Sequence, residues 1–162
     1  LPVHENPVEI VVTDGADSET YTVTITRLSP AEIQVVGKLN YSDASDSDIP
    51  SGSTIDFEYV FYNDFKEMTF TINNIGETTL NLTATAPDYV VITVDPDSVY
   101  TITTQPSEAT IPAGGWREFV VRFEELGSDT GEMTGSLEIA NDDSDEGTFT
   151  LDLTGQSGSS AI

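Results

Sequence analysis

The stretch Met68-Thr-Phe-Thr-Ile-Asn-Asn-Ile-Gly-Glu-Thr-Thr-Leu-Asn-Leu82 decides the fold of this chain. Phe70 and Ile72 alternate with polar residues, and a period of two is typical of a half-buried strand rather than a helix. The segment 73–76, Asn-Asn-Ile-Gly, breaks this alternation with turn residues. The alternation restarts over 80–82. The stretch therefore predicts a strand, a turn and a second strand, paired as an antiparallel hairpin that begins a sheet.

Similar alternation recurs along the rest of the chain, and no stretch shows helical spacing over three turns. The segment 54–62 places Ile55, Phe57, Tyr59 and Phe61 on one side. Short strands separated by turn signals predict an all-β fold, an immunoglobulin-like antiparallel β-sandwich with an additional N-terminal β-hairpin. The predicted strands are 8–13, 20–27, 33–36, 54–62, 66–73, 80–82, 89–94 (an inner strand), 99–103, 116–123, 135–140 and 148–154, and 40–52 is predicted to be a long polar loop.

The chain divides into three predicted parts. Residues 1–28 form a hairpin around an Asp-Gly turn, and residues 29–155 form the sandwich. Residues 156–162 are rich in glycine and serine, which is typical of a flexible linker or tail. Because the chain starts at Leu1 and shows no signal peptide, we expect it to be a piece of a longer protein.

Acidic residues dominate the composition. The 162 residues include 29 acidic and 5 basic side chains, for a formal net charge of −24. This excess disfavours nucleic acid and anionic membrane surfaces, because both are bound through clustered lysine and arginine. No apolar run is long enough to insert into a membrane, and without cysteine the chain has neither disulfides nor a thiolate site.

The sequence does not predict an enzyme. Asp129-Thr130-Gly131 spells the core motif of aspartic proteases, but that chemistry needs a second, facing copy and an apolar strand leading into it. His4 is the only histidine and no cysteine supports it, so a His-based metal site is not expected either.

Four ordered motifs carry a resemblance to a known family. They are Phe70-x-Ile72-x-Asn74-x-Gly76 with Leu80-x-Leu82, Ile111-Pro-Ala-Gly114 with Phe119-x-Val121-x-Phe123, Gly135-x-Leu137-x-Ile139-x-Asn141-Asp142, and Phe149-x-Leu151-x-Leu153-x-Gly155. With these motifs, residues 33–155 resemble the bacterial choice-of-anchor D domain, within the broader group of immunoglobulin-like domains related to those of ciliary and spindle proteins. The segment 21–27, Tyr-Thr-Val-Thr-Ile-Thr-Arg, with its acidic turn, is similar to the closing hairpin of bacterial cadherin-like repeats.

This resemblance implies a function without catalysis. Such domains are spacers or adhesive units of exported or surface-anchored bacterial proteins, so an extracellular or cell-surface location is expected. The expected partners are neighbouring domains of the same polypeptide, and an extracellular protein or glycan for an adhesive unit.

Calcium binding is the first alternative, because Ca²⁺ takes several carboxylate and carbonyl oxygens from flexible loops. Two loops are rich in such groups. The loop that begins at Asp142 starts like an EF-hand loop, but the twelfth position of that loop would be Leu153 instead of glutamate. The other interpretation is that aspartate serves turn formation and solubility here. The candidate calcium ligands are Asp43, Asp46 and Asp48 in one loop, and Asp142, Asp143, Asp145 and Glu146 in the other.

A carbohydrate- or protein-binding module is the second alternative, and it depends on Trp116. This residue follows Gly114-Gly115 and opens a strand. An exposed indole would offer a platform for a sugar ring, with Tyr59, Tyr62 or Tyr100 as helpers. The other interpretation is partial burial at the rim of the sandwich, since tryptophan is seldom fully exposed or fully buried.

Overall fold

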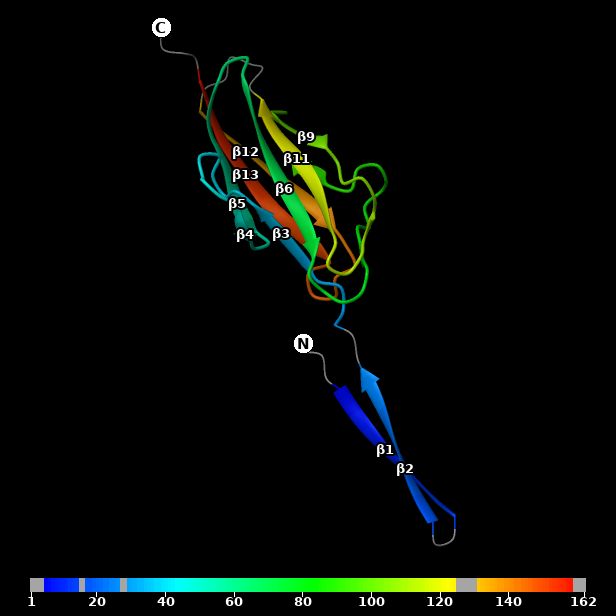
Figure 1. The fold of residues 1–162 in the computed structure, drawn as a ribbon. Helices are drawn as coiled ribbons and strands as arrows, with labels where there is room; N and C mark the ends of the chain where they lie inside the picture. The colour runs from blue at the N-terminus through cyan, green and yellow to red at the C-terminus, as the bar shows by residue number, and fades with distance from the viewer. Residues whose placement is uncertain (1–4, 15–16, 27–28, 125–130, 159–162) are drawn as a thin grey trace.

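Two β-sheets pack face to face in the computed structural model of this chain, and a separate hairpin precedes them (Figure 1). The structure describes residues 5–14, 17–26, 29–124 and 131–158; in the first two segments it describes backbone pairing and only the side chains of Thr22 and Val23. Within these segments the hairpin consists of β1 (Glu5–Asp14) and β2 (Asp17–Thr26), which pair antiparallel from Glu5↔Thr26 to Asp14↔Asp17.

The first large sheet has five strands in the order β4-β3-β6-β11-β9. β6 is its centre, with β11 antiparallel on one side and β3 antiparallel on the other. The strands are β3 (Ile33–Gly37), β4 (Ser47–Ile49), β6 (Phe65–Asn74), β9 (Tyr100–Thr104) and β11 (Trp116–Glu124).

The second sheet has four strands in the order β5-β13-β12-β8, and a short pair, β7 with β10, lies outside both sheets. β13 is antiparallel to β12 but parallel to β5. The strands are β5 (Ser53–Phe61), β7 (Leu80–Asn81), β8 (Val91–Val94), β10 (Thr110–Ile111), β12 (Gly131–Ala140) and β13 (Thr148–Gly158).

The hydrophobic core fills the space between the two large sheets. Its largest fully buried side chains are aromatic, and the rings of Phe70 and Phe119 stack with centroids 5.1 Å apart. Phe57, Tyr100 and Phe123 form a second aromatic group at distances of 5.1 to 5.9 Å. Burying one such side chain contributes about 1.5–3 kcal/mol, so the alternating apolar positions of the sequence stabilise the packing of the two sheets. The predicted all-β sandwich is therefore confirmed.

The hairpin predicted from Met68–Leu82 is wrong. β6 pairs with β3 and β11, whereas β7 leaves that sheet and pairs with β10. The turn between them is held by Asn74, whose buried side chain donates to the carbonyl oxygens of Thr78 and Ile111 at 2.7 and 2.9 Å. These bonds direct the chain across the end of the sandwich, so the second strand of the motif starts a different layer.

Three further predictions need correction. The predicted loop 40–52 contains β4, and the predicted inner strand 89–94 is the edge strand β8, with Val91 and Val94 exposed. β13 continues to Gly158, so residues 156–158, predicted to start a linker, belong to the sheet.

The predicted alternation of the segment 54–62 fails at Glu58. This residue has a φ of 59°, and β13 advances two residues while β5 advances three. The bulge reverses the direction of the following side chains. Val60 is consequently buried, while Tyr59 and Phe61 point to solvent.

Candidate functional site

Three carboxylates from distant parts of the chain meet at the end of the sandwich where β3 begins. Glu32 directly precedes β3, and Asp143 and Glu146 lie in the turn between β12 and β13. One carboxylate oxygen from each lies within 4.8 Å of the others. Their mutual distance is suited to a hard cation such as Ca²⁺, which accepts several oxygen ligands. We refer to Glu32, Asp143 and Glu146 as the carboxylate cluster.

Asp143 also holds the backbone together at this point. Its side chain accepts hydrogen bonds from the N–H groups of Ile33 at 2.8 Å and Asp145 at 3.2 Å. Burial acts to raise the pKa of Asp143, but these donors outweigh it and lower the pKa below its ordinary value. Asp143 is therefore a charged clamp between β3 and a turn 110 residues away.

The other two members have pKa values shifted in the opposite direction. Burial raises the pKa of Glu32, and the negative charges of Asp143, Asp145 and Glu146 raise it further. Burial and the charges of Asp143, Asp145 and Asp48 likewise raise the pKa of Glu146. Both shifts express first the cost of burying a charged carboxylate and then the repulsion between the gathered negative charges, and a bound cation would offset both.

The structure separates the predicted calcium ligands. Asp142 lies outside the cluster because its carboxylate accepts from the backbone N–H and the side-chain amide of Asn81, at 2.7 and 2.6 Å. Asp145 lies beside the cluster and is exposed. Asp43 caps a turn by accepting from the N–H of Asn40 at 2.8 Å. With Asp46 and Asp48 it forms no second convergent group of three among the described residues.

Glu32 is the member that sequence reasoning missed. It stands alone between a proline-containing break and a strand, with no acidic neighbour in the sequence. Only the tertiary structure, in which the N–H of Ile33 bonds to Asp143, brings it to the acidic turn. No local signal could have found it.

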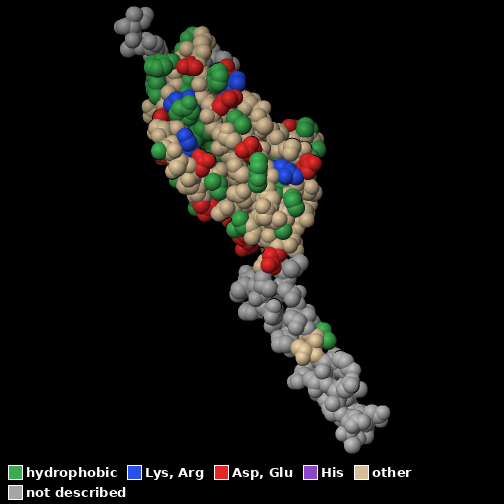
Figure 2. Space-filling view, viewed as in Figure 1, with side chains coloured by type: hydrophobic (Ala, Val, Ile, Leu, Met, Phe, Trp, Pro, Cys, Tyr) green, Lys and Arg blue, Asp and Glu red, His purple; other side chains and the backbone are tan. Residues whose placement is uncertain are grey.

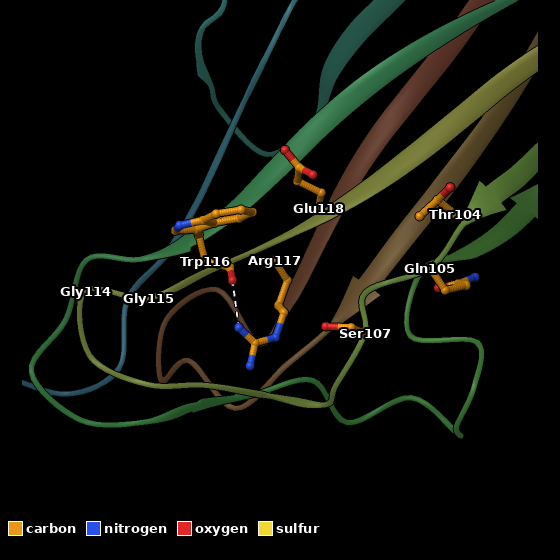
Figure 3. A pocket seen from close by; sticks show the side chains of 8 residues that line it. All are labelled: Thr104, Gln105, Ser107, Gly114, Gly115, Trp116, Arg117 and Glu118. Atoms are coloured by element: carbon orange, nitrogen blue, oxygen red, sulfur yellow. Dashed lines mark hydrogen bonds between the residues drawn. The ribbon is translucent and has the colours of Figure 1, made fainter.

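Trp116 lies at the rim of a hollow of about 500 Å³ on the five-stranded sheet. It is 55% exposed, so the interpretation as an exposed indole fits the geometry. In Figure 3 Trp116 and Glu118 point to the same side of β11, whereas Arg117 points to the other side. Arg117 donates to the Trp116 carbonyl at 2.8 Å and pairs with Glu108 at 2.7 Å, which fixes the start of β11.

The predicted aromatic helpers of Trp116 do not lie beside it. Tyr100 is buried, and its hydroxyl donates to the Met133 carbonyl at 3.0 Å. Tyr59 and Tyr62 lie near the Phe65 end of β6, whereas Trp116 is opposite Asn73 near the other end. Tyr41 is the aromatic residue on a neighbouring hollow of about 410 Å³, which shares Glu118 with the first.

Two other motifs singled out in the sequence lie largely outside the described residues. These are His4 and the first two residues of Asp129-Thr130-Gly131, whose glycine begins β12. In the part of the chain that is described, no helix has the length and apolar character needed to cross a bilayer.

Comparison with known proteins supports the fold class. Neither a protein-family model nor a curated protein matches the chain. Among solved structures, the ASH/PapD-like domain 7 of human CEP192 is similar at a TM-score of 0.52 and 14% identity, over 71% of this chain and 92% of that one. A protein of unknown function from Porphyromonas gingivalis W83 is similar at a TM-score of 0.53 and 10% identity, over 96% of this chain and 66% of that one.

The chain therefore contains an immunoglobulin-like β-sandwich. At these identities the similarity concerns the fold alone.

Proposed function

We propose that this chain is a non-catalytic spacer or adhesive module of a larger exported bacterial surface protein, of the choice-of-anchor D type. One observation carries the proposal: the chain enters and leaves the sandwich at opposite ends (Figure 1). Ile33 pairs with Asn74 at one end of β6, while Gly158 pairs with Phe61, next to the other end. An in-line spacer needs this arrangement, because it extends a string of domains instead of folding the string back.

Surface labelling of the source cells tests this proposal. Antibodies raised against the purified chain are expected to label intact cells, and external protease is expected to remove the signal. A cytoplasmic protein detected in parallel serves as the control for cell integrity. Labelling that appears only after permeabilisation would contradict the exported location.

Calcium stabilisation is a second candidate, favoured by the carboxylate cluster. Burial, and after it the neighbouring negative charges, raise the pKa values of Glu32 and Glu146, so both carboxylates are unfavourably placed when charged. A cation held between the two segments would offset these costs and crosslink the start of β3 to the turn between β12 and β13.

Thermal unfolding in calcium and in EDTA tests this candidate. Calcium at a hundred times its dissociation constant is expected to add about 2.7 kcal/mol, which raises the midpoint by roughly 5–10 °C. Glu146→Gln should abolish this shift. Asp142→Asn should retain it, because the Asp142 carboxylate is bonded to Asn81 and lies outside the cluster. No shift in the parent chain would leave the cluster as a structural clamp only.

A further inference from the structure

The two hollows on the five-stranded sheet adjoin on its outer face. Glu118 lines both of them, with Trp116 at one end and Tyr41 at the other. The strand register explains the polar floor between them, because Glu118 on β11 lies opposite Thr71 on β6, with Thr69 two residues further along. We call this surface, formed by Tyr41, Thr69, Thr71, Trp116 and Glu118, the outer-face groove.

The groove combines the exposed indole of Trp116 with polar groups that the fold does not use, while the ring of Tyr41 is contacted by the ammonium group of Lys66 at 4.3 Å. Trp116 is 55% and Tyr41 39% exposed. Among the described residues, no partner holds the carboxylate of Glu118 or the hydroxyls of Thr69 and Thr71. By contrast, the polar side chains nearby that stabilise the fold are engaged, as Arg117 is by Glu108. Exposed aromatic residues beside uncommitted hydrogen-bonding groups are typical of a binding surface.

A sugar ring matches this combination. One face of a pyranose presents C–H groups that pack on an aromatic ring, as other apolar surfaces do. Its edge carries hydroxyls that both donate and accept, so they match carboxylates and threonine hydroxyls. A fully apolar ligand would leave Glu118 desolvated and unpaired, which is costly.

The charge of the groove limits the type of sugar. Glu118, Glu67 and Asp46 contribute carboxylates to the lining of the two hollows, and Lys38 and Arg117 contribute cations, of which Arg117 is paired with Glu108. Figure 2 shows acidic side chains spread over the visible face of the sandwich, with few basic ones between them. With a net charge of −24, the chain repels sulfated and uronic acid polymers.

We propose that the outer-face groove binds a neutral oligosaccharide, stacked on Trp116 and hydrogen-bonded by Glu118 and the β6 threonines. The proposal goes beyond the spacer role, which would stand even if the groove bound nothing.

Trp116 is the only tryptophan, so its fluorescence reports directly on this site. The probes are the neutral hexasaccharides of β-1,4-glucan, β-1,3-glucan, β-1,4-xylan and β-1,4-mannan, with hexagalacturonic acid as the anionic counterpart and hexalysine as the cationic one. Titration to about 5 mM detects dissociation constants in the millimolar range. At least one neutral probe is expected to shift the fluorescence and to release heat in calorimetry, while hexagalacturonic acid does neither.

Matched variants locate the binding. Trp116→Ala is expected to weaken calorimetric binding at least about tenfold, since a buried aromatic anchor carries much of the affinity of a site. Tyr62→Ala is the control, because Tyr62 is equally exposed, at 52%, but lies at the other end of the sheet. Glu118→Ala should also weaken binding, whereas Glu138→Ala on the other sheet should not.

Circular dichroism serves to check that each variant is folded, and folding is expected in the two aromatic variants because Trp116 and Tyr62 are exposed. Three results would overturn the proposal: no response to any neutral probe, equal binding by the Trp116→Ala and parent chains, or tighter binding of hexalysine than of every neutral probe. The last result would assign the groove to a basic peptide instead.

Discussion

Asn74 stabilises the turn at the end of the sandwich where β6 ends and the chain crosses to β7. It is completely buried, and besides donating to Thr78 and Ile111 it accepts from the N–H of Gly76 at 3.1 Å. Gly76 itself has no room for a side chain, because a Cβ there would collide with the carbonyl oxygen of Pro30. In the Asn-x-Gly part of the motif, Asn74 therefore satisfies buried backbone groups where the chain crosses the end of the sandwich. Gly76 leaves the space that this crossing needs.

Replacing Asn74 should be among the most destabilising changes in this chain. Asn74→Ala leaves two carbonyls and an N–H without partners, and we expect it to lower the free energy of unfolding by about 2–4 kcal/mol. Asn73→Ala is the control, with an expected loss below about 1 kcal/mol, because Asn73 makes a single long bond of 3.4 Å to Gln34. Urea denaturation measures both, and equal losses would contradict this role for Asn74.

Glu32 gives the stability a pH dependence of known sign. Burial, followed by the charges of Asp143, Asp145 and Glu146, raises its pKa in the folded state. The folded chain therefore takes up this proton more readily than the unfolded chain, so the contribution of Glu32 to stability is present at low pH. That contribution is lost as the pH rises through the folded-state pKa. Asp143 acts oppositely because its pKa is lowered in the folded state. It stabilises the folded chain above the ordinary pKa of aspartate, and this contribution is lost as the pH falls through the lowered folded-state pKa.

Removing the charge of Glu32 should thus stabilise the calcium-free chain at neutral pH. In EDTA at pH 7, Glu32→Gln is expected to raise the free energy of unfolding by up to about 1 kcal/mol, because the group is partly screened by solvent. The gain should shrink toward about pH 4, where the glutamate of the parent chain becomes protonated. Chemical denaturation across this range measures the effect, and a pH-independent gain would argue against the ionisation of Glu32 as its cause.

At the scale of the strand, alternation in the sequence predicted well which segments form strands, and less well which side chains of a strand point to the core. β3, β6, β11 and the first half of β13 follow their predicted alternation, because each lies in a regular ladder with one face on the core. β5 departs from it at Glu58, whose positive φ no local pattern announces. One bulged residue was enough to exchange the exposure of Tyr59 and Val60.

β13 tests how closely the sheets are packed. Gly155 is buried, and a Cβ added there would lie 2.5 Å from the ring of Phe123. Gly155→Ala should therefore cost about 1–3 kcal/mol, since an extra methyl group in a packed core forces its neighbours to move. Gly147→Ala is the matched control, because its Cβ would meet nothing closer than 3.5 Å. Thermal unfolding that is unchanged in both variants would indicate a looser core than described.

At the scale of the whole molecule, the fold class was predictable and the topology was not. Turn signals and short strands are local features, so an all-β sandwich follows from them. The crossing of β7 to β10 and the parallel pairing of β13 with β5 depend on contacts between residues far apart in sequence. The candidate sites divide in the same way: Asp143, Glu146 and Trp116 were predicted, whereas Glu32 and Tyr41 needed the tertiary structure.

The separation of the two chain ends of the sandwich carries the spacer proposal. Ile75 bonds to Glu32 at the entry, and the N–H of Tyr62 bonds to the carbonyl of Gly158 at the exit. These points lie near opposite ends of β6, whose nine residue steps from Phe65 to Asn74 span roughly 30 Å at about 3.3 Å each. If the chain entered and left the sandwich at the same end, the entry and exit points would instead lie side by side.

A spin-label distance measurement tests this arrangement most directly. The chain has no cysteine, so Ile75→Cys with Tyr62→Cys gives two exposed and unique labelling positions. Double electron–electron resonance is expected to show a single distance population near 30 Å, the length of β6, broadened by the label tethers. A population centred below about 20 Å, too short for the length of β6, would contradict the in-line geometry and with it the spacer proposal.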